Sequence, residues 1–219
     1  MVGGSLPPVA FASDPGFLVL HSLRLKGFAE DEVVAGITGL DVDVVGKHLR
    51  AHADAELVVR RDGRVSGWSL TPAGRSRHTV DVAAELDASG AADELKSAYE
   101  RFLEINQAML VVCTSWQLRD VAGNQVINDH ADAAYDAEVV RGLVGIHDRV
   151  RPITADLREA LARFGLYGER LRTALEKVAA GEPEWFTKPV IDSYHTIWFE
   201  LHEDLLCTLG IERGSEGEG

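Results

Sequence analysis

The pattern of apolar and polar positions in the first third of the chain predicts helices followed by a β-hairpin. Apolar residues recur at helical spacing in three segments, 15–26, 29–37 and 41–53. Two alternating segments follow, 57–61 and 64–70, and the Asp62-Gly63 pair between them favours a tight hairpin turn. Thr71 and Pro72 then begin a helix that extends to Asp87.

Three residues mark the connection between the second and third helices as a helix-turn-helix. Ala35 is small enough for two helices to approach, Gly39 allows a turn with positive φ, and Val45 packs the third helix onto the second. Asp41 caps the third helix. We expect the inner face of this helix to hold Val44, Val45, Leu49 and His52, and its outer face Asp43, Lys47, Arg50 and Ala51.

After a domain boundary at residues 88–91, the pattern is helical throughout. The predicted helices cover 92–119, 134–164, 167–180 and 189–209, with a polar connection at 121–133. Pro152 falls inside the second of these helices and should kink or split it near Arg151. The predicted organisation is a flexible start (1–13), a helix-turn-helix and hairpin domain (14–87), an all-α helical bundle (92–211) and a disordered tail (212–219).

The charge of the chain changes this picture, because it is unevenly distributed. The net charge of −13 over 219 residues disfavours a simple nucleic-acid binder. Residues 1–80, however, hold nine basic and nine acidic residues, so the whole excess of acid lies beyond residue 80. Segment 44–80 holds seven basic and three acidic residues, a local charge of +4 that coincides with the third helix and the hairpin.

Sequence features also bear on localisation. No apolar run approaches the ~18 residues that span a membrane. The start of the chain lacks the basic and apolar regions of a signal peptide. Cys113 and Cys207 lie in apolar helical patterns, which is typical of reduced core thiols in a cytoplasmic protein, although a disulfide between them stays open.

The helix-turn-helix, the RRDGR hairpin and the following WSLTPAGR together resemble the winged helix-turn-helix regulators of the MarR and PadR type, over residues 14–85. This resemblance implies that the third helix enters the major groove of double-stranded DNA and that the hairpin, or wing, touches its backbone or minor groove. By resemblance, Lys47, Arg50, Arg61 and Arg64 are the DNA-binding residues. Asp41 and Asp43 depart from a typical recognition helix, because carboxylates at its start repel phosphate. A winged helix that contacts protein is the alternative.

A second resemblance concerns the C-terminal segment SYHTIWFELHEDLL. Together with the winged helix, this segment is similar to modules associated with actinobacterial pyruvate phosphate dikinase-type and other PEP-utilising proteins. The resemblance implies a metabolic context and assigns no site residue.

Five residues of the helical half are candidates for a ligand site: Asn106, Trp116, His195, Trp198 and His202. Asn106 lies near a buried stripe and needs a hydrogen-bond partner, which either the core or a ligand could supply. The aromatic residues could line a cavity, form a dimer seam or pack in the core. Asp192 and His195 have the spacing of a metal-ligand pair but lack a matching pair, so we predict no metal and no cofactor.

The sequence contains no phosphate-binding loop, nucleophile elbow, CxxC or HExxH motif, and we expect no enzyme. The leading hypothesis is a cytoplasmic, homodimeric, DNA-binding transcription regulator whose helical domain dimerises and senses a small metabolite. The alternative is an accessory module that does not bind DNA and docks on a metabolic, PEP-utilising enzyme.

Overall fold

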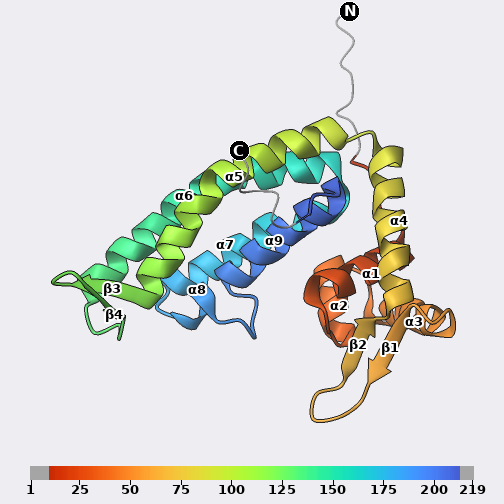
Figure 1. Cartoon of the computed structure of the whole chain (residues 1–219), viewed down its shortest axis with the longest axis horizontal. Helices are drawn as coiled ribbons and strands as arrows, with labels where there is room; N and C mark the ends of the chain where they lie inside the picture. Colours follow the sequence, from red (N-terminus) through yellow and green to blue (C-terminus); the bar gives the residue numbers. More distant parts are fainter. Residues whose placement is uncertain (1–9, 213–219) are drawn as a thin grey trace, which may run out of the picture.

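The computed structural model describes residues 10–212, and this part of the chain is mainly helical (Figure 1). Its elements are α1 (Pro15–Lys26), α2 (Asp31–Thr38), α3 (Val42–Asp54), β1 (Val58–Arg61), β2 (Gly67–Leu70), α4 (Pro72–Ser89), α5 (Ala92–Gln117), β3 (Leu118–Val121), β4 (Asn124–Ile127), α6 (Ala133–Ala160), the 3-10 helix η1 (Ala162–Phe164), α7 (Gly165–Ala179), α8 (Glu184–Thr187) and α9 (Tyr194–Leu209). None of the described helices combines the length and apolarity that a membrane crossing requires.

The predicted caps and turns of the first three helices are present. Asp14 Oδ1 accepts the Phe17 backbone N–H at 3.0 Å and begins α1, and Gly27 ends that helix with φ +73°. Gly39 adopts the left-handed conformation (φ 71°, ψ 8°), and its N–H bonds to the Ala35 carbonyl at 2.8 Å. Asp41 Oδ1 accepts the N–H of Asp43 at 2.8 Å and begins α3. Local sequence therefore sets the path of the chain through α1, α2 and α3.

The β1–β2 hairpin forms, but not through the tight Asp62-Gly63 turn that the sequence predicts. The two strands pair from Val58↔Leu70 to Arg61↔Gly67, which leaves residues 62–66 as a five-residue loop. The start of β2 is fixed by its other edge, where Trp68 and Ala29 exchange backbone hydrogen bonds of 2.8 and 3.1 Å. A Cβ on Gly67 would lie 2.7 Å from the Phe28 ring, so only glycine fits there.

The second half of the chain is a helical bundle with one strand pair that the sequence analysis missed. β3 and β4 pair antiparallel within the segment predicted as helix end and polar connection. This hairpin lies at the end of the long α5–α6 pair that is far from α1 to α3 (Figure 1). The prediction of an entirely helical half was therefore wrong.

Three further features of this half differ from the prediction. α6 continues through Pro152 without a break, and the chain leaves the helix at Leu161, which is extended (φ −132°) and fully buried. The final helix begins at Tyr194 instead of residue 189, because Ser193 caps it by accepting the N–H of Thr196 at 3.3 Å. The short connection after residue 183 contains α8.

The described residues form two hydrophobic cores. One lies among α1, α2, α3 and the β1–β2 hairpin, and the other among α5 to α9. We call α1 to α4 with β1 and β2 the N-terminal unit, and α5 to α9 with η1 the C-terminal bundle. Between the two cores, α1 and α4 of the N-terminal unit pack against α9.

Most of the predicted flexible start (1–13) and all but Glu212 of the predicted tail lie outside the described residues. Phe11, however, is ordered against the bundle. Its carbonyl accepts the N–H of Ala162 at 3.0 Å, and its side chain packs on the second core. The prediction of a flexible segment is therefore wrong for this residue.

Candidate functional site

The outer surface of α3 and the hairpin carries the four cations that resemblance assigns to DNA. Lys47, Arg50, Arg61 and Arg64 are all exposed. Within residues 10–212, none of the four forms an ion pair within 4.0 Å. Arg60 differs, because it pairs with Asp62 at 3.0 Å and packs over the Trp68 ring at 5.5 Å. The four side chains are thus available to anionic groups outside the protein.

The helix that bears Lys47 and Arg50 is anchored by its inner face, as predicted. Val45 and Leu49 are fully buried in the core of the N-terminal unit. His52 is half-buried and hydrogen-bonds the Gly16 carbonyl at 2.9 Å through Nε2, while burial lowers its pKa. This anchoring leaves α3 free to present its outer face as one rigid surface.

Acidic residues border the same surface. An open cleft of about 440 Å³ lies between the first turns of α2 and α3 and the hairpin. Glu30, Asp31, Glu32 and Asp43 line it, together with Arg50 and Arg60. The start of α3 therefore repels phosphate, whereas Lys47 and Arg50, farther along the helix, and Arg61 and Arg64 of the hairpin attract it.

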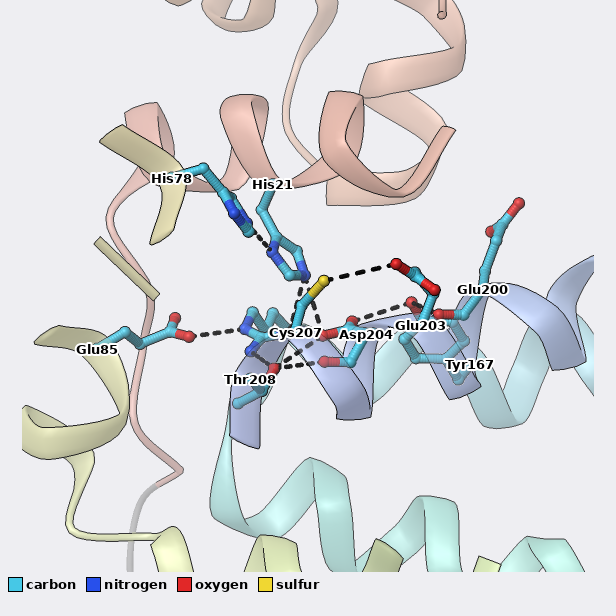
Figure 2. Close-up of polar contacts among 10 residues, drawn as sticks. His21, His78, Glu85, Tyr167, Glu200, Glu203, Asp204, Cys207 and Thr208 are labelled. Atoms are coloured by element: carbon cyan, nitrogen blue, oxygen red, sulfur yellow. Dashed lines mark hydrogen bonds and ion pairs between the residues drawn. The ribbon is translucent and has the colours of Figure 1, made fainter. Parts of the chain in front are cut away.

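A buried charge cluster joins the N-terminal unit to the C-terminal bundle (Figure 2). We give this name to His21 on α1, His78 and Glu85 on α4, Arg163 on η1 and Asp204 on α9. Figure 2 shows both histidines reaching from their helices toward Asp204, with Glu85 approaching from the side. His21 Nδ1 lies 2.9 Å from His78 Nε2, and His21 Nε2 lies 3.0 Å from Asp204 Oδ1.

Arg163 is the centre of this cluster. Its Nε donates to Glu85 Oε2 at 2.8 Å, its Nη1 donates to Asp204, and its Nη2 donates to Thr208 Oγ1 at 2.7 Å. The Tyr167 hydroxyl also donates a hydrogen bond to Asp204, at 2.9 Å from its Oδ2 atom. The side chains of Arg163 and Asp204 are each only 3% exposed, so the pair is shielded from solvent screening.

Ion pairs continue from this cluster along the contact between α1, α7 and α9. Arg170 on α7 bonds Glu200 at 2.7 Å and Asp192 at 3.1 Å. Lys26 at the end of α1 pairs with the same two carboxylates. Arg24 pairs with Glu203 at 2.8 Å. The end of the first helix is thus tied to the last helix by charge as well as by packing.

The environment shifts the pKa values of the cluster in opposite directions. Burial lowers the pKa of His78 to about 3, and the neighbouring His21 adds to this shift. Burial alone would raise the pKa of Asp204, but Arg163 and His21 outweigh it and hold that pKa below its usual range. Burial also raises the pKa of Tyr167. At neutral pH the cluster therefore holds a neutral His78 and an ionised Asp204.

A small cavity lies beside the cluster, between the N-terminal unit and the bundle. Its volume is about 30 Å³, and its walls include Leu18, Ile37, Leu166, Arg163 and Arg170. This volume suits about one water molecule and is too small for a metabolite. A ligand could enter only if α1 and α2 separated from α7.

The five predicted ligand residues do not come together around one cavity. Trp198 Nε1 donates to Asn106 Oδ1 at 2.9 Å, and the Phe102 ring lies 4.7 Å from Trp198 and 5.4 Å from His202. None of the five residues lines the small cavity beside the charge cluster, the cleft at α2 and α3, or the three other cavities found within residues 10–212 that have volumes of about 720, 320 and 410 Å³. The carbonyl oxygen of the Asn106 side chain thus has its partner within the core, which was one of the two alternatives that the sequence left open.

Trp116 lies apart from this pair, whereas His195 is three residues before Trp198 on α9. Trp116 is ten residues beyond Asn106 on α5, about 15 Å along an ideal helix, and contacts His130 and Phe186 at ring distances of 4.5 and 4.6 Å. Burial lowers the pKa of the half-buried His195. Among the aromatic candidates, Trp116 and Trp198 are 6% and 4% exposed, which places them in the core.

Asp192, which has the spacing of a metal-ligand pair with His195, bonds to Lys26 through one oxygen and to Arg170 through the other. No group of three or more metal-ligating side chains occurs in the described part of the chain. Cys113 and Cys207 are free thiols, and burial raises their pKa values to about 12 and about 11. Neither thiol is activated as a nucleophile.

Sequence reasoning missed the buried charge cluster. Nothing in the sequence relates His21, His78, Glu85 and Arg163 to one another, because they lie in separate segments of the chain. The only local signal was polar or charged residues at positions of α1 and α9 that helical spacing places toward the interior. No known family model, curated protein or solved structure matches this chain.

Proposed function

We propose that this protein is a DNA-binding transcription regulator whose N-terminal unit acts as a winged helix-turn-helix. The observation that carries the proposal is the set of four exposed cations on α3 and the β1–β2 hairpin, which form no ion pair with any residue between 10 and 212. The left-handed turn at Gly39 and the buried Val45 and Leu49 support it, because they orient α3 as a recognition helix would be oriented. Because the chain as a whole carries −13, the locally basic surface of α3 and the hairpin is the one that DNA would favour.

Binding should depend mainly on the DNA backbone. Asp41 and Asp43 occupy the tip of α3, from which base contacts are usually made. Lys47 and Arg50 lie farther along the helix, and Arg61 and Arg64 lie at the end of β1 and in the loop beside it. Four phosphate contacts per copy give a slope of log K against log salt of about −3.6 per copy.

The test is a binding titration on genomic fragments at several salt concentrations. We expect Arg50→Ala and Arg64→Ala each to weaken binding and to make the salt slope shallower by about 1 per copy. Arg141→Ala is the matched control, because Arg141 is 70% exposed but lies on α6. If both variants bind with unchanged affinity and salt slope, the proposed DNA surface is wrong.

The helical half would supply dimerisation and, as a further part of the proposal, a response to a small metabolite. A ligand that favoured a different position of α9 would act on the N-terminal unit through Asp204 and the buried charge cluster. The spacing of two recognition helices, which must match half-sites about 34 Å apart, would then change.

A second candidate function has its own supporting observation. The cleft lined by Glu30, Asp31, Glu32 and Asp43 could receive a basic segment of another protein, as in an accessory module for a PEP-utilising enzyme. Calorimetry with such an enzyme from the same organism tests this function. Docking would be favoured over DNA recognition by two results together. The wild type would bind the enzyme and the Asp43→Lys variant would not, and the wild type would fail to retain DNA at low salt.

A further inference from the structure

One face of α5 differs from the rest of the molecular surface because it carries no charge. Residues 105–118 form the longest run of the chain without Asp, Glu, Lys or Arg. Five residues of this run that belong to α5 are exposed, and we call them the neutral face: Gln107, Leu110, Val111, Thr114 and Gln117. On an ideal helix they fall within a stripe about 120° wide. Leu110 is 50% and Val111 57% exposed.

The same helix provides its own comparison. Toward the N-terminus, the exposed side of α5 is charged, with Lys96, Glu100 and Glu104. Both halves of the helix bury an apolar stripe in the same core, from Leu95 to Trp116. The core therefore does not explain why charge disappears from the solvent side of the second half.

Further exposed apolar side chains follow directly after the end of α5. Gln117 leads directly into β3, and the β3–β4 hairpin exposes Val121 (47%), Val126 (41%) and Ile127 (80%). A stable dimer buries about 800 Å² per copy, more than one helical stripe supplies. The hairpin lies at the end of the same helix (Figure 1), and Val121 and Val126, which share one of its faces, would add to this area.

We propose that the neutral face and the β3–β4 hairpin form the interface with a second copy of this chain. Charge selects this occupant. Two chains of −13 repel each other, and this repulsion is weakest where the two surfaces carry no charge, as on the neutral face; the exposed Asp120 of the hairpin is the one acidic residue of the proposed interface. An anionic membrane would repel the same chain, which disfavours a lipid surface. The choice of a second copy also rests on the proposed function, because a two-fold operator requires two recognition helices.

A two-fold axis through the middle of the neutral face sets two α5 helices antiparallel, with Val111 close to its own mate. In such an isologous contact one substitution is introduced twice. Val111→Glu would therefore place two carboxylates side by side, whereas a mixture of Val111→Glu and Val111→Lys would place opposite charges there.

The test is the mass of the full-length chain in solution, measured by light scattering and sedimentation at about 0.15 M salt. We expect a dimer for the wild type, a monomer or at least a 100-fold weaker dimer for Val111→Glu, and recovered dimers in the mixture of Val111→Glu and Val111→Lys. Val80→Glu is the control, because Val80 is also a helical valine, 66% exposed on α4. Circular dichroism checks that each variant folds.

A wild type that is monomeric at tens of micromolar overturns the proposal, as does a folded Val111→Glu variant that stays fully dimeric. If the mixture of Val111→Glu and Val111→Lys does not form dimers, the two-fold arrangement with Val111 beside its own mate is wrong. DNA binding is measured separately. A wild type that is dimeric but shows no salt-dependent binding to DNA refutes the proposed function and leaves the interface standing. A wild type that is monomeric but binds DNA through Arg50 and Arg64 refutes the interface and leaves the proposed function standing.

Discussion

Replacement of Arg163 by methionine tests whether the buried charge cluster holds the two halves of the molecule together. Methionine keeps the length and much of the volume of the side chain but removes its charge and its donors. The guanidinium now bonds Glu85, Asp204 and Thr208 and lies 4.5 Å from the Phe164 ring. Arg163→Met leaves two carboxylates that are 5% and 3% exposed without their main counter-charge.

Removing one partner of a buried ion pair costs about 3–5 kcal/mol, because the remaining charge stays desolvated. Two carboxylates depend on Arg163, and His21 and Tyr167 still bond one of them, Asp204. We therefore expect the free energy of unfolding to fall by about 4 kcal/mol at pH 7, a large part of the 5–15 kcal/mol that is usual for a domain. The loss should shrink near pH 4, because the stranded carboxylates then take up protons.

Urea unfolding followed by circular dichroism measures this change. Arg172→Met is the control, because Arg172 is 51% exposed and makes its ion pairs with Glu169 and Glu176 at the surface. The control should change stability by less than about 0.5–1 kcal/mol. A loss below 1 kcal/mol for Arg163→Met, or a loss that does not depend on pH, would refute the view that Arg163 compensates buried carboxylates.

Two further predictions concern His78 and Gly67. Burial lowers the pKa of His78 from its ordinary value of 6.5 to about 3 in the folded chain, so the unfolded chain binds more protons below pH 6.5. The stability contributed by the neutral ring is complete above that pH and is lost as the pH falls toward 3. As the pH is lowered from 6.5 to 4.5, the free energy of unfolding should fall by up to about 2–3 kcal/mol less in His78→Gln than in the wild type. Equal pH profiles for the two proteins would contradict a neutral, buried His78. Gly67→Ala should destabilise the chain by about 1–3 kcal/mol, because its Cβ would meet the Phe28 ring at 2.7 Å and the Ala29 carbonyl at 2.9 Å. Gly63→Ala, with nothing within 4 Å of its Cβ, is the control, and equal melting temperatures for the two variants would show that β2 is not fixed at Gly67.

The sequence by itself determined the elements whose signals are local. A left-handed glycine at 39, caps at Asp14, Asp41 and Thr71, and the helical period of α5 each depend on residues within one or two turns. Such short-range preferences can be read without knowing what packs against the element. The mainly helical class and the β1–β2 hairpin follow from them.

Tertiary structure decided the features in which distant residues meet. The start of β2 depends on Phe28 and Ala29, so an Asp-Gly signal alone gave the wrong turn. The β3–β4 hairpin is held by Asn128, which donates to the Trp116 carbonyl at 3.1 Å and to Asp136 at 2.8 Å from outside both strands.

The buried charge cluster is the clearest case. His21 and Asp204 are 183 positions apart, and Arg163 and Glu85 are 78 apart. Helical spacing fixes the face on which each residue lies but not which other helix that face meets. The packing of α1 and α4 against α9, together with the position of η1, brought these charges together, and their removal from water made them a joint between the two halves of the molecule.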